Sequence, residues 1–121
     1  MSEHEASAAS AEISIEDFQR VDIRVGRILS AEPLAGARKP AYALRIDFGP
    51  EIGVKQSSAQ INVHYTPEKL VGTLALGVVN VPSRRIAGFR SEVLTLGVSD
   101  ADGAVILVAP RSDAPVGARL F

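Results

Sequence analysis

Three arginines and two apolar side chains share one short stretch of the sequence. Arg84, Arg85 and Arg90 carry positive charge, and Ile86 and Phe89 lie between them. Guanidinium groups bind phosphates and carboxylates through paired hydrogen bonds, and an aromatic ring offers a face on which a nucleobase can stack. A loop kept polar only for solubility is the alternative, but it would not need the two apolar residues. The stretch therefore indicates a binding surface, for a polyanion or for an extended polypeptide.

Other side chains could extend this surface. Arg38 and Lys39 stand at the tip of a loop rich in proline and glycine, and across the mouth of a small barrel they would join the arginines. Tyr42 is a second aromatic candidate for stacking. Residues 55–60 supply a lysine, amides and hydroxyls to one surface, which suits a binding face. The same run is typical of an edge strand kept polar to prevent aggregation, and the sequence alone slightly favours that interpretation.

No arrangement of residues in the sequence is typical of an enzyme or of a metal site. The two histidines, His4 and His64, lie far apart in the chain and have no ligand spacing. There is no cysteine, and hence no disulfide framework, thiolate metal site or thiol nucleophile. Ser57 and Ser58 have no base close to them in the sequence, and no nucleophile elbow occurs. We expect no enzymatic activity, no metal and no cofactor.

Length and charge indicate one small domain with an acidic N-terminal tail. The chain has 121 residues and a net charge of −1, and its length suffices for one hydrophobic core. Residues 1–17 hold five acidic residues and no Lys or Arg, so residues 18–121 hold 13 Lys and Arg against 9 acidic residues. We expect a mobile tail over residues 1–12 and a folded domain over residues 13–121. Without a membrane-spanning run or a signal-peptide pattern, we expect a cytoplasmic protein that does not insert into membranes.

Apolar alternation predicts five or six short strands and two short helices. The clearest strand covers residues 42–48, and the first strand, residues 20–31, changes phase at Gly26, where a bulge would let the sheet curl. Ser14 and Thr66 are expected to precede short helices. The remaining predicted strands are 54–58, 74–81, 93–98 and 105–108, the last of them buried.

The order of these elements predicts an all-β fold with one or two short helices. A helix between the third and fourth strands, together with a curling glycine in the first strand, matches the OB-fold, a five-stranded Greek-key barrel. A β-sandwich is the structural alternative. Because the position of the helix between strands favours the barrel, we expect an OB-fold.

Several long motifs also resemble those of one known family. They are residues 15–18, 22–26, 46–49, 51–61 and 79–94. Through them, residues 13–121 resemble the CsaA-type secretion chaperones, which belong to the superfamily of OB-fold tRNA-binding domains. The resemblance implies a homodimeric bacterial OB-fold protein that is associated with protein export, with unfolded precursor proteins and with the export motor ATPase. The wider superfamily binds the outside corner of tRNA.

The sequence departs from the tRNA-binding pattern at two places. Where these domains usually carry glycine and methionine at the entry to the fifth strand, this chain has Val93 and Leu94. Where those that bind tRNA tend to have Ala-Asp-Lys-Leu, residues 37–40 read Ala-Arg-Lys-Pro, and the proline stiffens the loop. Asn80, Ser91 and the arginines match the pattern. Contact with phosphates therefore remains open, while the superfamily's mode of tRNA recognition is in question.

We favour an export chaperone that binds unfolded precursors as a homodimer, with a tRNA-binding module as the alternative and a scaffolding domain as a third, weaker interpretation. The candidates for polypeptide binding are Tyr42, Ile86 and Phe89. The candidates for RNA binding are the basic and hydrogen-bonding residues Arg38, Lys39, Lys55, Asn80, Arg84, Arg85, Arg90 and Ser91. The candidates for a dimer interface are the apolar residues near the two ends of the folded domain, Phe18, Leu120 and Phe121.

Overall fold

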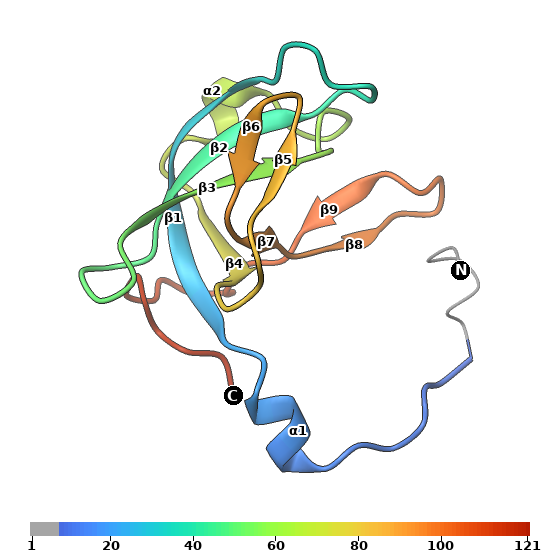
Figure 1. Ribbon diagram of the computed structural model, residues 1–121, viewed down its shortest axis with the longest axis vertical. Coiled ribbons are helices and arrows are strands. Elements are labelled where there is room, and N and C mark those ends of the chain that lie inside the picture. The colour runs from blue at the N-terminus through green and yellow to red at the C-terminus, as the bar shows by residue number, and fades with distance from the viewer. Residues whose placement is uncertain (1–7) are drawn as a thin grey trace.

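The computed structural model describes residues 8–121, which form short strands and two short helices (Figure 1). Residues 8–13 are exposed and belong to neither a helix nor a strand. Residues 1–7 of the predicted mobile tail, including His4, lie outside the described residues. No helix within residues 8–121 is long and apolar enough to cross a membrane.

Both helices begin where the sequence predicts. Helix α1 (Ile15–Gln19) is capped by Ser14, whose hydroxyl oxygen accepts a hydrogen bond from the Asp17 backbone N–H at 3.0 Å. This bond satisfies one of the free amides of the first helical turn. Helix α2 (Pro67–Leu70) follows Thr66, which makes no side-chain capping bond, and a proline stands in its first turn. As predicted, α2 lies between the third and fourth strands.

Five antiparallel strands form the main sheet, in the order β3-β2-β1-β4-β7. They are β1 (Ile23–Pro33), β2 (Tyr42–Asp47), β3 (Val54–Ala59), β4 (Leu74–Val78) and β7 (Leu94–Thr95). The long strand β1 changes partner along its length: residues 23–27 pair with β4, and residues 27–33 pair with β2. A strand that passes from one neighbour to the other in this way is coiled, so the sheet curls towards a barrel.

Side chains take a large part in joining the two edges of this sheet. The Ser57 hydroxyl of β3 donates to the Val93 carbonyl at 3.2 Å and lies 2.7 Å from the Thr95 hydroxyl. The Glu92 backbone N–H donates to the Gln56 carbonyl at 2.8 Å, and the Glu92 carboxylate accepts from the Gln56 N–H at 3.0 Å. These bonds produce a nearly closed five-stranded barrel, which confirms the predicted OB-fold.

Phe48 fills the barrel interior because two strands present glycine to its ring. The side chain is 1% exposed. A Cβ atom on Gly26 of β1 would lie 2.5 Å from Ile46 Cγ2 and 2.7 Å from Phe48 Cε1, and one on Gly77 of β4 would lie 3.0 Å from Phe48 Cζ. All three distances are shorter than ordinary van der Waals contact. The two glycines therefore make room for the aromatic core.

The bulge predicted at Gly26 is wrong. β1 pairs with β4 without a break through residues 23–27, and the irregular register lies between Ile28 and Ser30, opposite β2. The apolar phase changes at Gly26 because its backbone is pressed against Phe48 and Ile46. The glycine thus serves close packing, and the extra residue of the strand lies farther along.

Two further hairpins leave the barrel. Their strands are β5 (Arg84–Ile86) with β6 (Phe89–Ser91), and β8 (Gly97–Ser99) with β9 (Val105–Leu107). The predicted strand 93–98 is therefore divided between β7 and β8. The predicted burial of residues 105–108 is wrong, since Ile106 is exposed and its neighbours are only half-buried. β9 pairs with β8 alone, and this hairpin extends away from the main sheet (Figure 1).

The contact between Gly26 and Phe48 predicts a large and specific loss of stability on adding one methyl group. Gly26→Ala should lower the free energy of unfolding by about 2–3 kcal/mol, because the new Cβ overlaps the ring and Ile46. Phe48→Leu in the same chain should recover part of this loss, with a coupling of about 1 kcal/mol. Urea unfolding of the two single variants and the double variant measures the coupling. Strictly additive losses would contradict this packing.

Candidate binding site

The β5–β6 hairpin places two arginines directly opposite each other. In its register Arg85 faces Arg90, and Ile86 faces Phe89. The two-residue turn consists of Ala87 and Gly88, with φ of 51° and 78°. Positive φ at both positions is what such a tight turn requires. Opposed Cβ atoms on a sheet lie roughly 4.5–5.5 Å apart, so like charges on them repel. The sequence suggested only a loop here, although the glycine at the second turn position was a usable signal for a hairpin.

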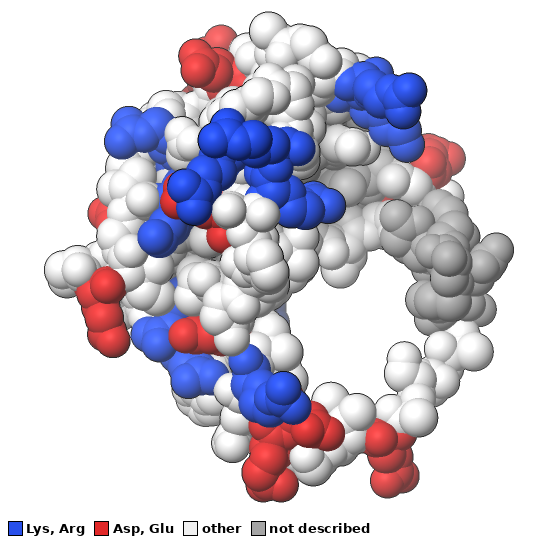
Figure 2. Space-filling view, viewed as in Figure 1, with Lys and Arg blue, Asp and Glu red and all other residues white. Residues whose placement is uncertain are grey.

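The arginines of the hairpin have no acidic ion-pair partner within residues 8–121. The arginine ion pairs found there involve Arg20, Arg24, Arg27 and Arg119 instead. Arg84, Arg85 and Arg90 are exposed, as are Arg38 and Lys39. Figure 2 shows Lys and Arg side chains gathered over the β5–β6 hairpin. This face therefore concentrates positive charge that the described part of the chain does not neutralise.

A groove of about 400 Å³ joins the hairpin to the loop between β1 and β2. The loop and the hairpin turn are neighbours, since a Cβ atom on Gly36 would lie 3.7 Å from the Cβ of Ala87. We call this cavity the basic groove. Its functional groups come from the loop, the end of β3 and the hairpin: Arg38, Lys39, Ser58, Gln60, Arg85 and Ile86. The structure thus brings together two basic segments that the sequence predicted would meet.

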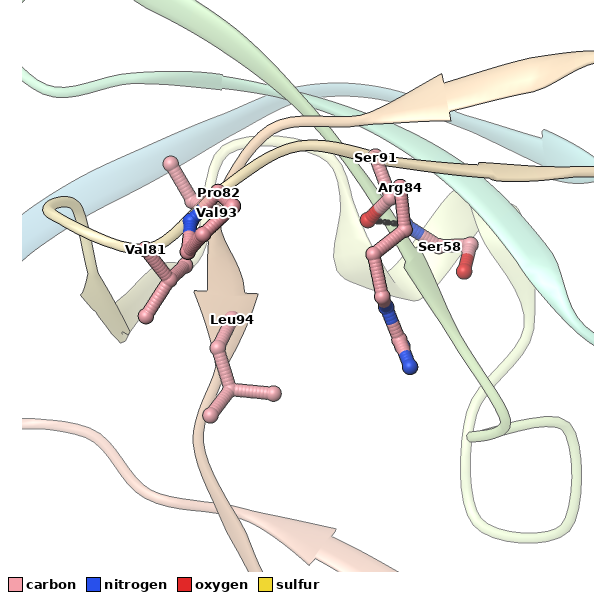
Figure 3. A pocket seen from close by; sticks show the side chains of 7 residues that line it. All are labelled: Ser58, Val81, Pro82, Arg84, Ser91, Val93 and Leu94. Atoms are coloured by element: carbon pink, nitrogen blue, oxygen red, sulfur yellow. Dashed lines mark hydrogen bonds between the residues drawn. The ribbon is translucent and has the colours of Figure 1, made fainter.

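A second cavity, of about 330 Å³, lies beside the basic groove, and we call it the apolar pocket (Figure 3). Ser58 lines both cavities. The apolar walls of the pocket are formed by Val81, Pro82, Val93 and Leu94, and its polar groups belong to Ser58, Arg84 and Ser91. Arg84 therefore faces a different cavity from its neighbour Arg85.

Two of the predicted RNA-binding residues hold the fold together. The Asn80 side chain accepts from the Asp22 backbone N–H at 2.9 Å and donates to the Arg20 carbonyl at 2.7 Å, which fastens the link between α1 and β1. Ser91 is buried, and its hydroxyl oxygen accepts from the Ser58 backbone N–H at 3.0 Å. Lys55 is half-buried on β3 and lines neither cavity.

The prediction that Tyr42 is available to a ligand is wrong. Tyr42 is a core residue, 9% exposed, and its hydroxyl donates to the Tyr65 carbonyl at 2.8 Å. It continues the buried face of β2, and the Tyr65 carbonyl satisfies the one polar group that could have kept the ring at the surface. Ile86 lines the basic groove, whereas Phe89 is half-buried on the other strand of the hairpin and lines neither cavity.

The three predicted interface residues meet in one place. Phe18 of α1, with Leu120 and Phe121 at the C-terminus, lines a cavity of about 300 Å³. Leu120 also packs against the core cluster built on β1 and β4, whereas Phe121 is fully exposed, at 106%. Exposed Ile15 lies on the same helix as Phe18. Both ends of the folded domain therefore contribute to one apolar face.

An ion-pair network holds this face to the barrel. The Arg24 guanidinium donates to the Asp22 carboxylate at 2.6 Å, and Arg119 lies 3.7 Å from the same carboxylate. The hydrogen bond from Arg24, with the charges of both arginines, lowers the pKa of Asp22. Asp22 is therefore a carboxylate at neutral pH and ties the C-terminal segment to the start of β1.

A pair that sequence reasoning missed links the β8–β9 hairpin to the barrel. His64 Nε2 lies 2.7 Å from Asp100 Oδ2, and this hydrogen bond, with backbone N–H groups of the β8–β9 turn, lowers the pKa of Asp100.

Val98 and Ile106 lie opposite each other on the β8–β9 hairpin and are 56% and 38% exposed. The sequence does not show that these two residues form one apolar surface, because this depends on the pairing of β8 with β9. No cluster of three or more metal-ligating side chains occurs within residues 8–121.

Comparison with known proteins assigns the chain to a family. A family model described as "Putative tRNA binding domain" matches residues 23–119. The chain belongs to this family. Its structure is also similar to solved structures of the chaperone CsaA from Bacillus anthracis and Picrophilus torridus, with 47% and 43% sequence identity and a TM-score of 0.85 for each. These matches cover 92% and 91% of this chain and 100% of each CsaA chain, so the CsaA-type resemblance predicted from the sequence is confirmed.

Curated relatives in the same family include methionine–tRNA ligases. The ligase of Porphyromonas gingivalis is 35% identical over 117 residues, which is 97% of this chain and 17% of the ligase. The ligase of Chlorobium chlorochromatii is 40% identical over 101 residues, 14% of its length. The chain therefore spans only about a sixth of the length of these curated relatives.

Proposed function

We propose that the chain is a non-catalytic RNA-binding module that takes tRNA-type ligands on the β5–β6 hairpin and in the basic groove. The pairing of Arg85 with Arg90 carries this proposal. Like charges in a cross-strand pair destabilise the free protein. A bound phosphate neutralises both guanidinium groups and removes the repulsion. The Arg85–Arg90 pair thus destabilises the free protein and stabilises a complex with an anion.

The surrounding side chains suit a phosphate backbone. Arg38 and Lys39 add two exposed cations to the groove that Arg85 lines, and Ser58 and Gln60 add hydrogen-bonding groups for sugars or bases. The class of RNA is supported by the match to the tRNA-binding-domain family and by relatives that are methionine–tRNA ligases. Because the proposal gives the chain only a binding role, any catalysis in a longer relative would belong to its other domains.

Replacing two arginines should weaken RNA binding in a salt-dependent way. We expect the double variant Arg84→Ala/Arg85→Ala to bind tRNA about tenfold or more weakly at moderate salt. The slope of log affinity against log salt should fall by about 1.5, because two phosphate contacts are lost. Filter binding or fluorescence anisotropy across a salt series measures both quantities.

A matched control removes the same charge elsewhere. Arg20 and Arg111 are exposed and line neither the basic groove nor the apolar pocket. The double variant Arg20→Ala/Arg111→Ala should keep nearly all of the affinity and the slope. Equal losses in the two double variants would contradict a localised site, and a native chain that fails to bind tRNA even at low salt would overturn the proposed function.

A second candidate function is that of a chaperone for unfolded polypeptides. It is supported by the similarity to CsaA chaperones over their full length and by the exposed apolar pair Val98 and Ile106 on the β8–β9 hairpin. Leu94, which immediately precedes this hairpin, is also 49% exposed. Apolar side chains in such an arrangement suit an extended client segment. Under this candidate the partners are unfolded precursor proteins and the export motor ATPase, in the cytoplasm.

The chaperone function predicts that the apolar pair slows aggregation. An excess of the native chain should reduce light scattering after a chemically denatured reporter protein is diluted into buffer, with little dependence on salt. Val98→Ser/Ile106→Ser should lose most of this effect, because the client loses its apolar contact. Val63→Ser/Val71→Ser, at two other exposed valines, is the control and should retain it. Unchanged aggregation in the presence of the native chain would rule out this candidate.

We also propose that the chain forms a homodimer through the face that contains Phe18, Leu120 and Phe121. A fully exposed C-terminal aromatic residue beside an apolar cavity is stabilised when a second copy covers it. Ile15, three residues before Phe18 on α1, is also exposed. Two copies related by a twofold axis would bury both sets of apolar side chains together.

Sedimentation at micromolar concentration should therefore give twice the single-chain mass of 12.8 kDa. Phe121→Asp should shift the equilibrium towards the single chain, because each interface would bury two unpaired carboxylates. Val63→Asp places the same charge at another exposed site and should leave the dimer intact. A single-chain mass for the native protein would refute the dimer.

A further inference from the structure

We infer that the apolar pocket binds one unpaired nucleobase of an RNA ligand, whose phosphate lies on Arg84. This inference rests on the proposed RNA-binding function. It adds which part of the RNA, beyond the phosphate backbone, the protein contacts. The pocket is about 330 Å³ in volume. That is near the lower end of the roughly 300–1,000 Å³ range of small-ligand sites, which suits a single ring system.

The walls of the pocket provide an apolar surface for one face of a ring and a guanidinium for the other. Val81 and Pro82 come from the segment before β5, and Val93 and Leu94 come from the segment that enters β7. Figure 3 shows these side chains on one side of the cavity and Arg84 on the other. A flat base placed between them would contact aliphatic groups on one face and a planar guanidinium on the other, and bases stack on such planes.

The polar groups of the pocket distinguish a base from an apolar peptide side chain. The Ser58 backbone N–H is already bonded to Ser91, but within residues 8–121 its hydroxyl has no hydrogen-bond partner. This hydroxyl can donate to, or accept from, the edge of a base. A leucine or valine side chain would cover the hydroxyl and Arg84 without bonding either, which costs free energy.

Charge complementarity between the pocket and its surroundings favours a nucleotide. Arg84 stands at the pocket, and Ser58 connects it to the basic groove with Arg38, Lys39 and Arg85. A base in the apolar pocket and its neighbouring phosphates in the groove would use both cavities at once. A paired base inside a duplex is stacked on both faces and cannot enter, so the ligand must offer a looped-out or single-stranded nucleotide.

One substitution separates a base-binding pocket from general attraction to phosphates. Leu94→Arg blocks the pocket while it adds a positive charge, and the side chain is 49% exposed, so the fold should tolerate it. Electrostatics alone predicts tighter RNA binding by this variant, whereas a base-binding pocket predicts weaker binding. Val63→Arg adds the same charge at an exposed site outside the pocket and is the matched control.

The probe is an RNA hairpin with 2-aminopurine at one unpaired loop position, compared with the same nucleotide in a blunt duplex. We expect the native chain and Val63→Arg to change the fluorescence of the loop probe and to leave that of the duplex probe unchanged. Leu94→Arg should abolish the change and bind the loop RNA about tenfold more weakly, as expected on losing one stacked base. Val81→Arg, on the other part of the apolar wall, should repeat this result if Leu94→Arg unfolds the protein.

Three results would overturn the inference. If Leu94→Arg and Val81→Arg bind the loop RNA as tightly as Val63→Arg, while Arg84→Ala/Arg85→Ala does not, RNA binding stands and the pocket holds no base. If the native chain binds neither RNA at low salt, the proposed function fails together with the inference. If the loop probe shows no change, but an uncharged leucine-rich peptide binds and Leu94→Arg prevents this, the pocket serves a polypeptide.

Discussion

The packing of Phe48 between two glycine backbones is the contact on which the rest of the structure depends. Gly26 and Gly77 lie on neighbouring strands, and a methyl group on either one would crowd the ring. Because both strands approach the ring so closely, β1 can coil around it and pass from β4 to β2. That coil brings β3 close to the chain that enters β7, so the barrel closes and gains a defined interior.

The closure of the barrel also positions the binding surface. The β5–β6 hairpin enters the gap between the sheet edges through Ser91, which is buried and accepts a bond from the Ser58 backbone. The two cavities then lie on either side of Ser58, with Arg84 at one and Arg85 at the other. The bond between Ser58 and Ser91, next to the bonds that close the barrel, thus holds the charged and the apolar part of the site side by side.

The sequence predicted much of this arrangement, and its errors share a cause. The order of strands and helices and the cap at Ser14 depend on local patterns, and the meeting of the loop at Arg38 with the arginine-rich stretch follows from the barrel that this order predicts. Tyr42 was assigned to a ligand surface because alternation cannot say whether a tyrosine at the end of an apolar face finds a partner for its hydroxyl. That partner, the Tyr65 carbonyl, lies 23 residues away.

The sequence by itself determined the fold class, the concentration of positive charge and the absence of cysteine, because periodicity, charge and composition are read from residues close together in the chain. Only the tertiary structure decided which of these residues face a ligand. Asn80 and Ser91 have structural roles because their side chains accept hydrogen bonds from backbone N–H groups 58 and 33 residues away in the sequence. Val98 and Ile106 became one exposed surface for a similar reason, since burial depends on which distant segments pack against a side chain.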